Sequence, residues 1–190
     1  SAQATRIAAS VRARYEVAVA QGVGAITDVH GGAGEKAAEF FRRAADLAAG
    51  EGLSFEDAAR TVIRAYIAEG RRIEGMGHRV HTRDPRRDVL WRLAEEGGLA
   101  GPCVAVSRIA GDVLREVRGL DLPINVDGVI GAVVADMGLD PKLAKALFIF
   151  GRVMGLSAHD YEEVTTQLPM RRINFGEAVY RGTPERPYPA

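Results

Sequence analysis

The spacing of apolar residues along this chain is helical nearly everywhere, and this periodicity constrains the fold more than any other feature. Val126, Val129 and Ile130, for example, fall on one face of a helix together with Val133 and Val134. The alternation of apolar and polar residues that marks a half-buried strand is absent, apart from a possible short extended stretch at 173–181. The sequence therefore predicts an all-α protein.

Capping residues and glycines indicate where the helices begin and end. Ser54, with Asp57 three residues later, forms a capping box, and Asp140 followed by Pro141 is typical of an N-cap and a first helical position. The second expected helix should close at Gly50. That second helix covers residues 34–49, and further helices are expected over residues 5–20, 85–96, 103–118 and 126–137.

Length, charge and cysteine content exclude several classes of protein. The 190 residues suffice for one domain or two small lobes, and 25 basic residues balance 25 acidic ones. Bulk charge therefore predicts no nucleic-acid partner, and no apolar run is long enough to cross a membrane. Cys103 is the only cysteine, which excludes an internal disulfide and favours a cytoplasmic location.

The stretch DVHGGAGE, residues 28–35, places His30 where a loop is expected to pass into a helix. A helix N-terminus offers free N–H groups and the positive end of a dipole. This environment favours a neutral imidazole that donates a hydrogen bond to a developing oxyanion. The alternative is a histidine beside a helix cap, with Gly31 and Gly32 serving only the turn.

A second stretch, EGMGHRVHTRDPR at residues 74–86, carries His78 and His81. A metal site would need three or four ligands, so none is expected. The stretch is either a solvated basic loop or a ligand-binding one. In the second interpretation the backbone around Gly75–Gly77 meets a flat ligand. His78 and Arg86 then bind an oxygen-rich anion, since a guanidinium fork holds two carboxylate oxygens.

Two charged residues interrupt apolar stretches further along. Asp127 opens the helix in NVDGVIGAVVADMG, and Arg152 lies within LFIFGRVMGL. They form either a structural buried ion pair, or a base of raised pKa and an anion-binding arginine. With two imidazoles, one carboxylate and several arginines, the chain is suited to removing a proton beside a carbonyl of a polycarboxylate.

Four motifs, VHGGAGE, GMGHRVHTRDPR, INVDG and FGRVMGLSAH, occur in this order and resemble the C-terminal catalytic half of the citrate synthase superfamily. The resemblance covers roughly residues 1–182. In the stretches INVDGVIGAVVADMGL and FIFGRVMGLSAHDYEEV, the chain is more similar to citryl-CoA lyases and to the lyase module of ATP-citrate lyase than to ordinary citrate synthases.

The resemblance implies roles for five residues. His30 would stabilise the enol or enolate of acetyl-CoA, and His78 would polarise the ketone of oxaloacetate. Asp127 would take the methyl proton. Arg86 and Arg152 would bind the substrate carboxylates. The coenzyme A thioester is the substrate in this scheme, and no covalently bound cofactor is implied.

Other implied contacts come from a loop and from a second subunit. A further arginine would cross from the partner in a homodimer, with Arg172 fitting that place and Arg171 as its rival. His81 is expected to be a bystander. The implied coenzyme A-binding residues are Arg72, Ile73, Gly75, Met76, Gly77 and Asn125.

The resemblance also implies a citrate synthase-like fold, in which a small helical domain is inserted into part of a large one. Residues 33–139 would form the small coenzyme A-binding domain, and residues 1–32 with 140–190 a portion of the large domain. The N-terminal part of the large domain would precede residue 1, either in a longer chain or on another polypeptide. That part would include a histidine-containing segment that touches oxaloacetate.

The implied function is that of a citryl-CoA lyase or citrate synthase, which breaks or makes the carbon–carbon bond between acetyl-CoA and oxaloacetate. One alternative is 2-methylcitrate synthase or another acyl-CoA condensation. A second is a non-catalytic family member that binds coenzyme A. The motifs leave the direction of the reaction open, because the same groups serve both directions.

Overall fold

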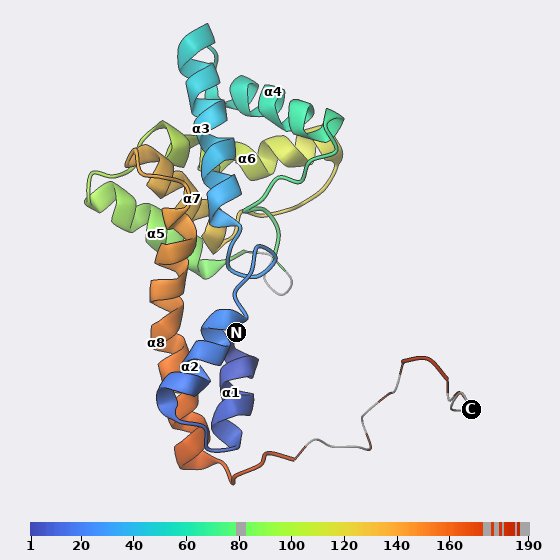
Figure 1. Cartoon of the computed structure of the whole chain (residues 1–190). Helices are drawn as coiled ribbons and strands as arrows, with labels where there is room; N and C mark the ends of the chain where they lie inside the picture. The colour runs from blue at the N-terminus through green and yellow to red at the C-terminus, as the bar shows by residue number, and fades with distance from the viewer. Residues whose placement is uncertain (79–82, 173–175, 177–178, 180, 185, 187–190) are drawn as a thin grey trace.

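The computed structural model describes residues 1–78, 83–172, 176, 179, 181–184 and 186. These residues form eight helices and no strand, which confirms the all-α prediction (Figure 1). Most of the possible extended stretch at 173–181 lies outside the described residues. The helices are α1 (Ala2–Ser10), α2 (Tyr15–Gly24), α3 (Gly34–Glu51), α4 (Phe55–Ala68), α5 (Pro85–Glu96), α6 (Pro102–Arg118), α7 (Val126–Asp136) and α8 (Leu143–Thr166).

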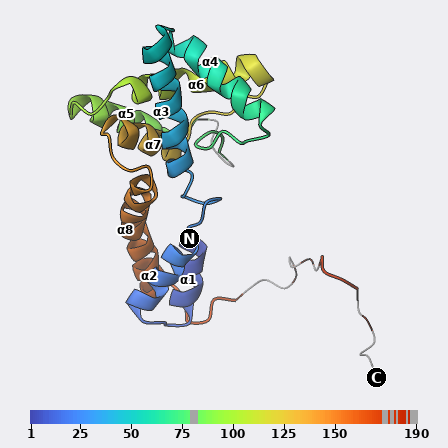
Figure 2. The same ribbon diagram turned by 45° about the horizontal axis from the view of Figure 1, so that its top comes forward.

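The helices gather in two groups that are joined by α8. Helices α3 to α7 surround one hydrophobic core, in which the rings of Phe41 and Tyr66 meet Phe40 edge to face at 5.2 and 5.4 Å. Helix α8 contacts α7 and α3, and then runs away from them to pack against α1 and α2 (Figures 1 and 2). Among the described residues, no helix is long and apolar enough to cross a membrane.

Most of the predicted helix boundaries are confirmed, because local capping groups set them. The hydroxyl of Ser54 accepts a hydrogen bond from the backbone N–H of Asp57 at 3.1 Å, as expected at a helix start. Helix α5 has the predicted bounds, with Pro85 as its first residue. Helix α6 ends at Gly119, whose φ of 66° is the left-handed conformation that glycine favours.

The prediction of a single helix over 5–20 is wrong, because the chain breaks between α1 and α2. Arg12 adopts a left-handed φ of 59° there. Its guanidinium donates to the main-chain oxygens of Glu163, at 3.4 Å, and Gln167, at 2.9 Å, near the end of α8. The break also lets both short helices pack against α8. Tertiary contacts thus override the helical propensity of this alanine-rich stretch.

Two other predicted boundaries are displaced. Helix α3 closes at Gly52, which has a φ of 65°, and passes through Gly50, where the prediction ended it. Helix α8 has Lys142 as its N-cap. The Asp140 carboxylate instead accepts from the Lys142 N–H at 2.9 Å, in the turn that leads into the helix.

Candidate active site

A cavity of about 790 Å³ lies between α5, α7 and α8. Arg86, in the first turn of α5, and Arg152, midway along α8, both line it. The rest of its wall is mostly apolar, and the Arg152 guanidinium lies 5.0 Å from the centre of the Phe148 ring. Two guanidinium groups on an otherwise apolar wall are suited to holding an anion with several carboxylates.

Asp84 fixes the position of Arg86. Its carboxylate is fully buried and accepts from Arg86 Nε at 2.9 Å, from Arg86 Nη2 at 2.8 Å and from the Arg86 backbone N–H at 3.1 Å. The same carboxylate accepts from the Val126 N–H at 2.9 Å, so it joins the start of α5 to the start of α7. Burial raises the pKa of Asp84, but the hydrogen bonds outweigh this effect, so the pKa lies below its ordinary value.

Asp127 lies in the first turn of α7, one residue beyond that contact. Its Oδ1 atom is buried and finds no hydrogen-bond partner in the described part of the chain. Burial raises the pKa of Asp127, and this effect outweighs the opposing influence of Arg86, the Ala33 backbone and Arg152. A carboxylate in such surroundings is a stronger base than one in water.

The loop that carries His78 is hydrogen-bonded to the segment before Asp127. The Gly77 N–H donates to the Pro123 oxygen at 2.7 Å, and the Asn125 N–H donates to the Gly75 oxygen at 3.0 Å. Gly75 and Gly77 have φ values of 81° and 86°. A Cβ on Gly75 would lie 2.6 Å from the Gly128 Cα, so only glycine fits there.

Asn125 has both ends of its side-chain amide bound within the protein. Its Oδ1 accepts from the Gly128 N–H at 3.1 Å as the N-cap of α7, and its Nδ2 donates to the Gly77 oxygen at 2.8 Å. These contacts fix the His78 loop against α7. Of the other predicted coenzyme A-binding residues, Arg72 is exposed, while Ile73 and Met76 pack partly against the core.

His30 lies in a tight turn that precedes α3. Its N–H and carbonyl form hydrogen bonds with Thr27, and α3 begins four residues later at Gly34. The Ser1 hydroxyl lies 3.0 Å from the His30 ring Nε2 and accepts from Arg152 Nη1 at 2.6 Å. His30 therefore lies where a loop passes into a helix, as the sequence predicts, and residues 31–33 separate it from the first residue of α3.

The three predicted catalytic residues thus lie on segments that meet. Ala33, three residues after His30, forms a backbone hydrogen bond to Asp127, and Gly77, beside His78, is bound by Asn125, two residues before Asp127. His81 lies outside the described residues. No group of three histidine, cysteine or acidic side chains suited to a metal ion occurs in the described part of the chain.

Arg172 does not line this cavity in a single chain. It follows α8, whose C-terminal end lies beside α1 and α2, whereas α5 and α7 lie at the other end of α8 (Figure 1). Thr166 lies fourteen positions after Arg152 in α8, and at about 1.5 Å per position the two are roughly 21 Å apart along the helix axis. Arg171, the alternative to Arg172, is bound to Glu163.

Sequence reasoning missed Asp84, Ser1 and Phe148 as neighbours of the site. Asp84 was detectable, because an aspartate directly before Pro85 is a typical N-cap. Ser1 and Phe148 gave no signal, since their contacts with His30, Arg152 and Gly31 depend on how distant segments pack.

Substitution of Gly31 tests how the turn that carries His30 packs against Phe148. Its φ is 75°, and a Cβ there would lie 2.1 Å from Cε1 of the Phe148 ring. We expect Gly31→Ala to lower the free energy of unfolding by about 1–3 kcal/mol, because strain and overpacking act together. Urea unfolding measures this change. Gly50→Ala is the matched control, since no atom lies within 4 Å of its Cβ and it lies within α3, so it should not destabilise. Equal stability of the two variants would contradict this packing.

The chain is similar in sequence to known proteins. Residues 1–173 match the family model described as citrate synthase, C-terminal domain. A putative citrate synthase 2 from Mycobacterium tuberculosis is 32% identical over an alignment of 169 residues, and the match covers 83% of this chain and 41% of that protein. The chain therefore spans about two fifths of the length of such curated relatives.

Solved structures show the same architecture. Citryl-CoA lyase from Hydrogenobacter thermophilus has a TM-score of 0.78 and 34% identity, covering 98% of this chain and 71% of that one. A citrate synthase from Thermoplasma acidophilum, in a ternary complex with carboxymethyl coenzyme A and oxaloacetate, has a TM-score of 0.72 and 25% identity. That match covers 100% of this chain and 49% of the archaeal one. These similarities confirm the predicted citrate synthase-like fold.

Proposed function

Because this chain belongs to the citrate synthase family, whose C-terminal domain its residues 1–173 match, we propose that it breaks or makes the carbon–carbon bond of citryl-CoA. In the cleavage direction the products are acetyl-CoA and oxaloacetate. The observation that carries the proposal is the raised pKa of Asp127, a partly buried carboxylate within the electrostatic reach of Arg86 and Arg152. A scaffold that only bound coenzyme A would have no use for such a base.

We assign each step of cleavage to a residue of this chain. His78 takes the proton from the hydroxyl of citryl-CoA as the carbon–carbon bond breaks and the ketone of oxaloacetate forms. The electron pair of that bond becomes the enolate of acetyl-CoA, whose oxygen accepts a hydrogen bond from His30. Protonated Asp127 then gives its proton to the enolate carbon. Synthesis reverses these steps, with Asp127 as the base.

Arg86 and Arg152 hold the carboxylates in this proposal, and the Arg72–Gly77 loop receives coenzyme A. The thioester is a substrate, so no tightly bound cofactor is required. We also propose that residues 33–139 act as the small domain and residues 1–32 with 140–190 as part of the large one. Closure between them would then exclude water from the cavity.

We further propose that the working form is a homodimer. The large-domain helices carry exposed apolar side chains, which a second subunit would cover. These are Ile7 at 70%, Val11 at 61%, Phe150 at 69%, Met154 at 74% and Tyr161 at 70% exposure. Arg172, which lies far from the cavity of its own chain, would reach that of the partner.

The proposed activity is tested in two assays, one with citryl-CoA and one with acetyl-CoA and oxaloacetate. Formation of acetyl-CoA and oxaloacetate from citryl-CoA supports a lyase, and release of free thiol from acetyl-CoA with oxaloacetate supports a synthase. Preference for propionyl-CoA would instead indicate a 2-methylcitrate synthase. Calorimetric binding of coenzyme A without any turnover would indicate the non-catalytic alternative. Absence of turnover and of coenzyme A binding would refute the proposal.

A further inference from the structure

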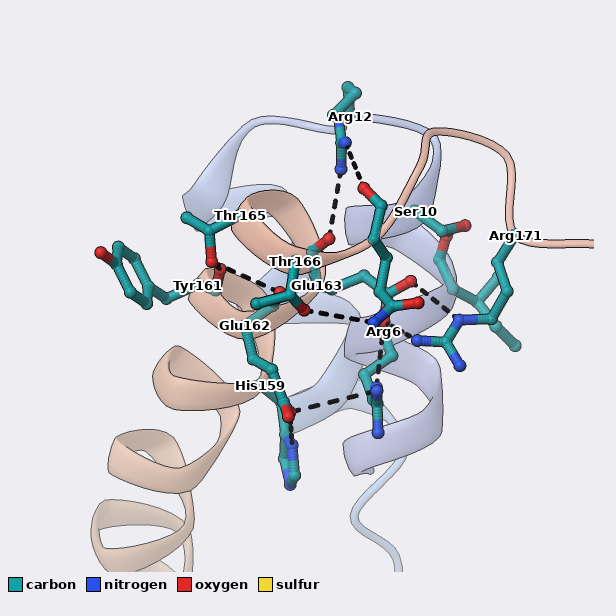
Figure 3. A network of polar contacts seen from close by, with 12 residues as sticks. Arg6, Ser10, Arg12, His159, Tyr161, Glu162, Glu163, Thr165, Thr166 and Arg171 are labelled. Carbon is teal, nitrogen blue, oxygen red and sulfur yellow. Dashed lines mark hydrogen bonds and ion pairs between the residues drawn. The ribbon is translucent and has the colours of Figure 1, made fainter.

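A fully buried carboxylate, Glu163, lies near the C-terminal end of α8 and is bound by two arginines, one on α1 and one just beyond the end of α8 (Figure 3). Arg6, on α1, donates from Nε to Glu163 Oε2 at 3.1 Å. Arg171, beyond the end of α8, donates from Nε to Oε1 at 2.9 Å and from Nη2 to Oε2. The two bonds from Arg171 form a bidentate pair, the strongest common arrangement of guanidinium and carboxylate.

Glu163 is ionised when it binds the two arginines. Hydrogen bonds from Arg171, and then from Arg6, hold the pKa of Glu163 below its ordinary value, although burial acts in the opposite direction. The carboxylate therefore stays ionised, and both arginines remain bound, at neutral pH. Neighbouring Glu162 is exposed, and its carboxylate lies 4.0 Å from the Arg6 guanidinium, so its contact with Arg6 is much weaker than that of Glu163.

A second set of contacts fixes the path of the chain between α8 and Arg171. The Met170 N–H donates to the Ser10 oxygen at 2.7 Å, and Met170 adopts a left-handed φ of 55°. Arg12 donates to the Gln167 oxygen at 2.9 Å, so it holds the residue that follows α8. Residues 167–171 are thus tied to the end of α1, and the last tie is the pair between Arg171 and Glu163.

We propose that Glu163 is a positioning residue for Arg172, the carboxylate-binding arginine of the proposed function, on which this inference rests. Consecutive Cα atoms lie about 3.8 Å apart, so fixing Arg171 restricts where Arg172 can reach. Both arginines are exposed, but the fork of Arg171 is occupied by Glu163. The arginine pair is therefore divided into an anchor, Arg171, and a substrate-binding residue, Arg172.

The test is Glu163→Gln, which keeps the shape of the side chain and removes its charge. We expect KM for oxaloacetate in synthesis, or for citryl-CoA in cleavage, to rise about tenfold, the effect of losing one charged hydrogen bond. Affinity for free coenzyme A should not change. Glu162→Gln is the matched control and should behave as the wild type. Unchanged KM in Glu163→Gln would overturn the proposal.

A double-mutant cycle separates positioning from general loss of structure. If Glu163 acts through Arg172, adding Glu163→Gln to Arg172→Ala should produce no further rise in KM. Full additivity of the two effects would overturn the proposal. Should Glu163→Gln fail to fold, Arg171→Gln removes the same pair from its half-exposed end and takes its place in the cycle.

Hydrogen exchange keeps this inference distinct from the proposed function. The Met170 amide should exchange faster in Glu163→Gln than in Glu162→Gln, because the anchor of its segment is lost. A wild type without turnover would refute the proposed function, while this exchange difference would still reveal the anchor. Equal exchange in both variants would show that Glu163 does not fix the segment.

Discussion

Replacing Asp127 by asparagine should lower kcat by about 10²- to 10⁴-fold, the range that general acid–base catalysis contributes. Asparagine has nearly the same shape but can neither take up nor deliver the proton. Steady-state assay of citryl-CoA cleavage and of synthesis measures the loss. Asp112→Asn, in an exposed ion pair on α6, is the control and should keep full activity. An Asp127→Asn variant with normal kcat would contradict the assignment.

The same substitution should not destabilise the protein. Because burial raises the pKa of Asp127 in the folded state, folding favours the protonated form, and the ionised carboxylate costs stability at neutral pH. We therefore expect Asp127→Asn to unfold at the same temperature as the wild type or at a higher one. Its free energy of unfolding should rise by up to about 0.5–2 kcal/mol. In the wild type, synthesis should weaken as pH falls through the raised pKa, because the base becomes protonated.

The second large effect is expected at Asp84. Asp84→Ala removes a buried carboxylate and leaves the Arg86 guanidinium and the Val126 N–H without their acceptor, and it should lower the free energy of unfolding by about 2–4 kcal/mol. It should also raise KM for the carboxylate substrate, because Arg86 loses its fixed orientation. Urea unfolding and steady-state kinetics measure the two effects.

Asp88→Ala is the matched control for Asp84, since Asp88 lies one turn later on α5 and pairs with Arg83 and Arg87 near the surface. Surface pairs contribute little, so this variant should change stability by less than about 1 kcal/mol. The pKa of Asp84 is lowered in the folded state, so its contribution is present above the ordinary aspartate pKa and is lost as pH falls below it. Similar stability of the two variants would show that Asp84 does not join α5 to α7.

Much of the helical layout was predictable, because local signals determine it. Ser54, Pro85 and Gly119 act through neighbouring backbone groups, and their helices begin or end where the sequence predicts. The break at Arg12 was not predictable, because its cause is a contact with the end of α8, more than 150 residues away. Local propensity favours one helix there, and only packing against α8 favours two.

The candidate site divides in the same way. The sequence by itself determined which residues carry the chemistry: two imidazoles, one carboxylate and the arginines, since residue types and motif order are local information. Only the tertiary structure decided that Asp127 is partly buried with a raised pKa, that Asp84 also accepts from the Val126 N–H, and that Arg6 is bound to Glu163. Burial and ion pairing depend on which distant segments meet, and the spacing of residues along the chain does not encode that.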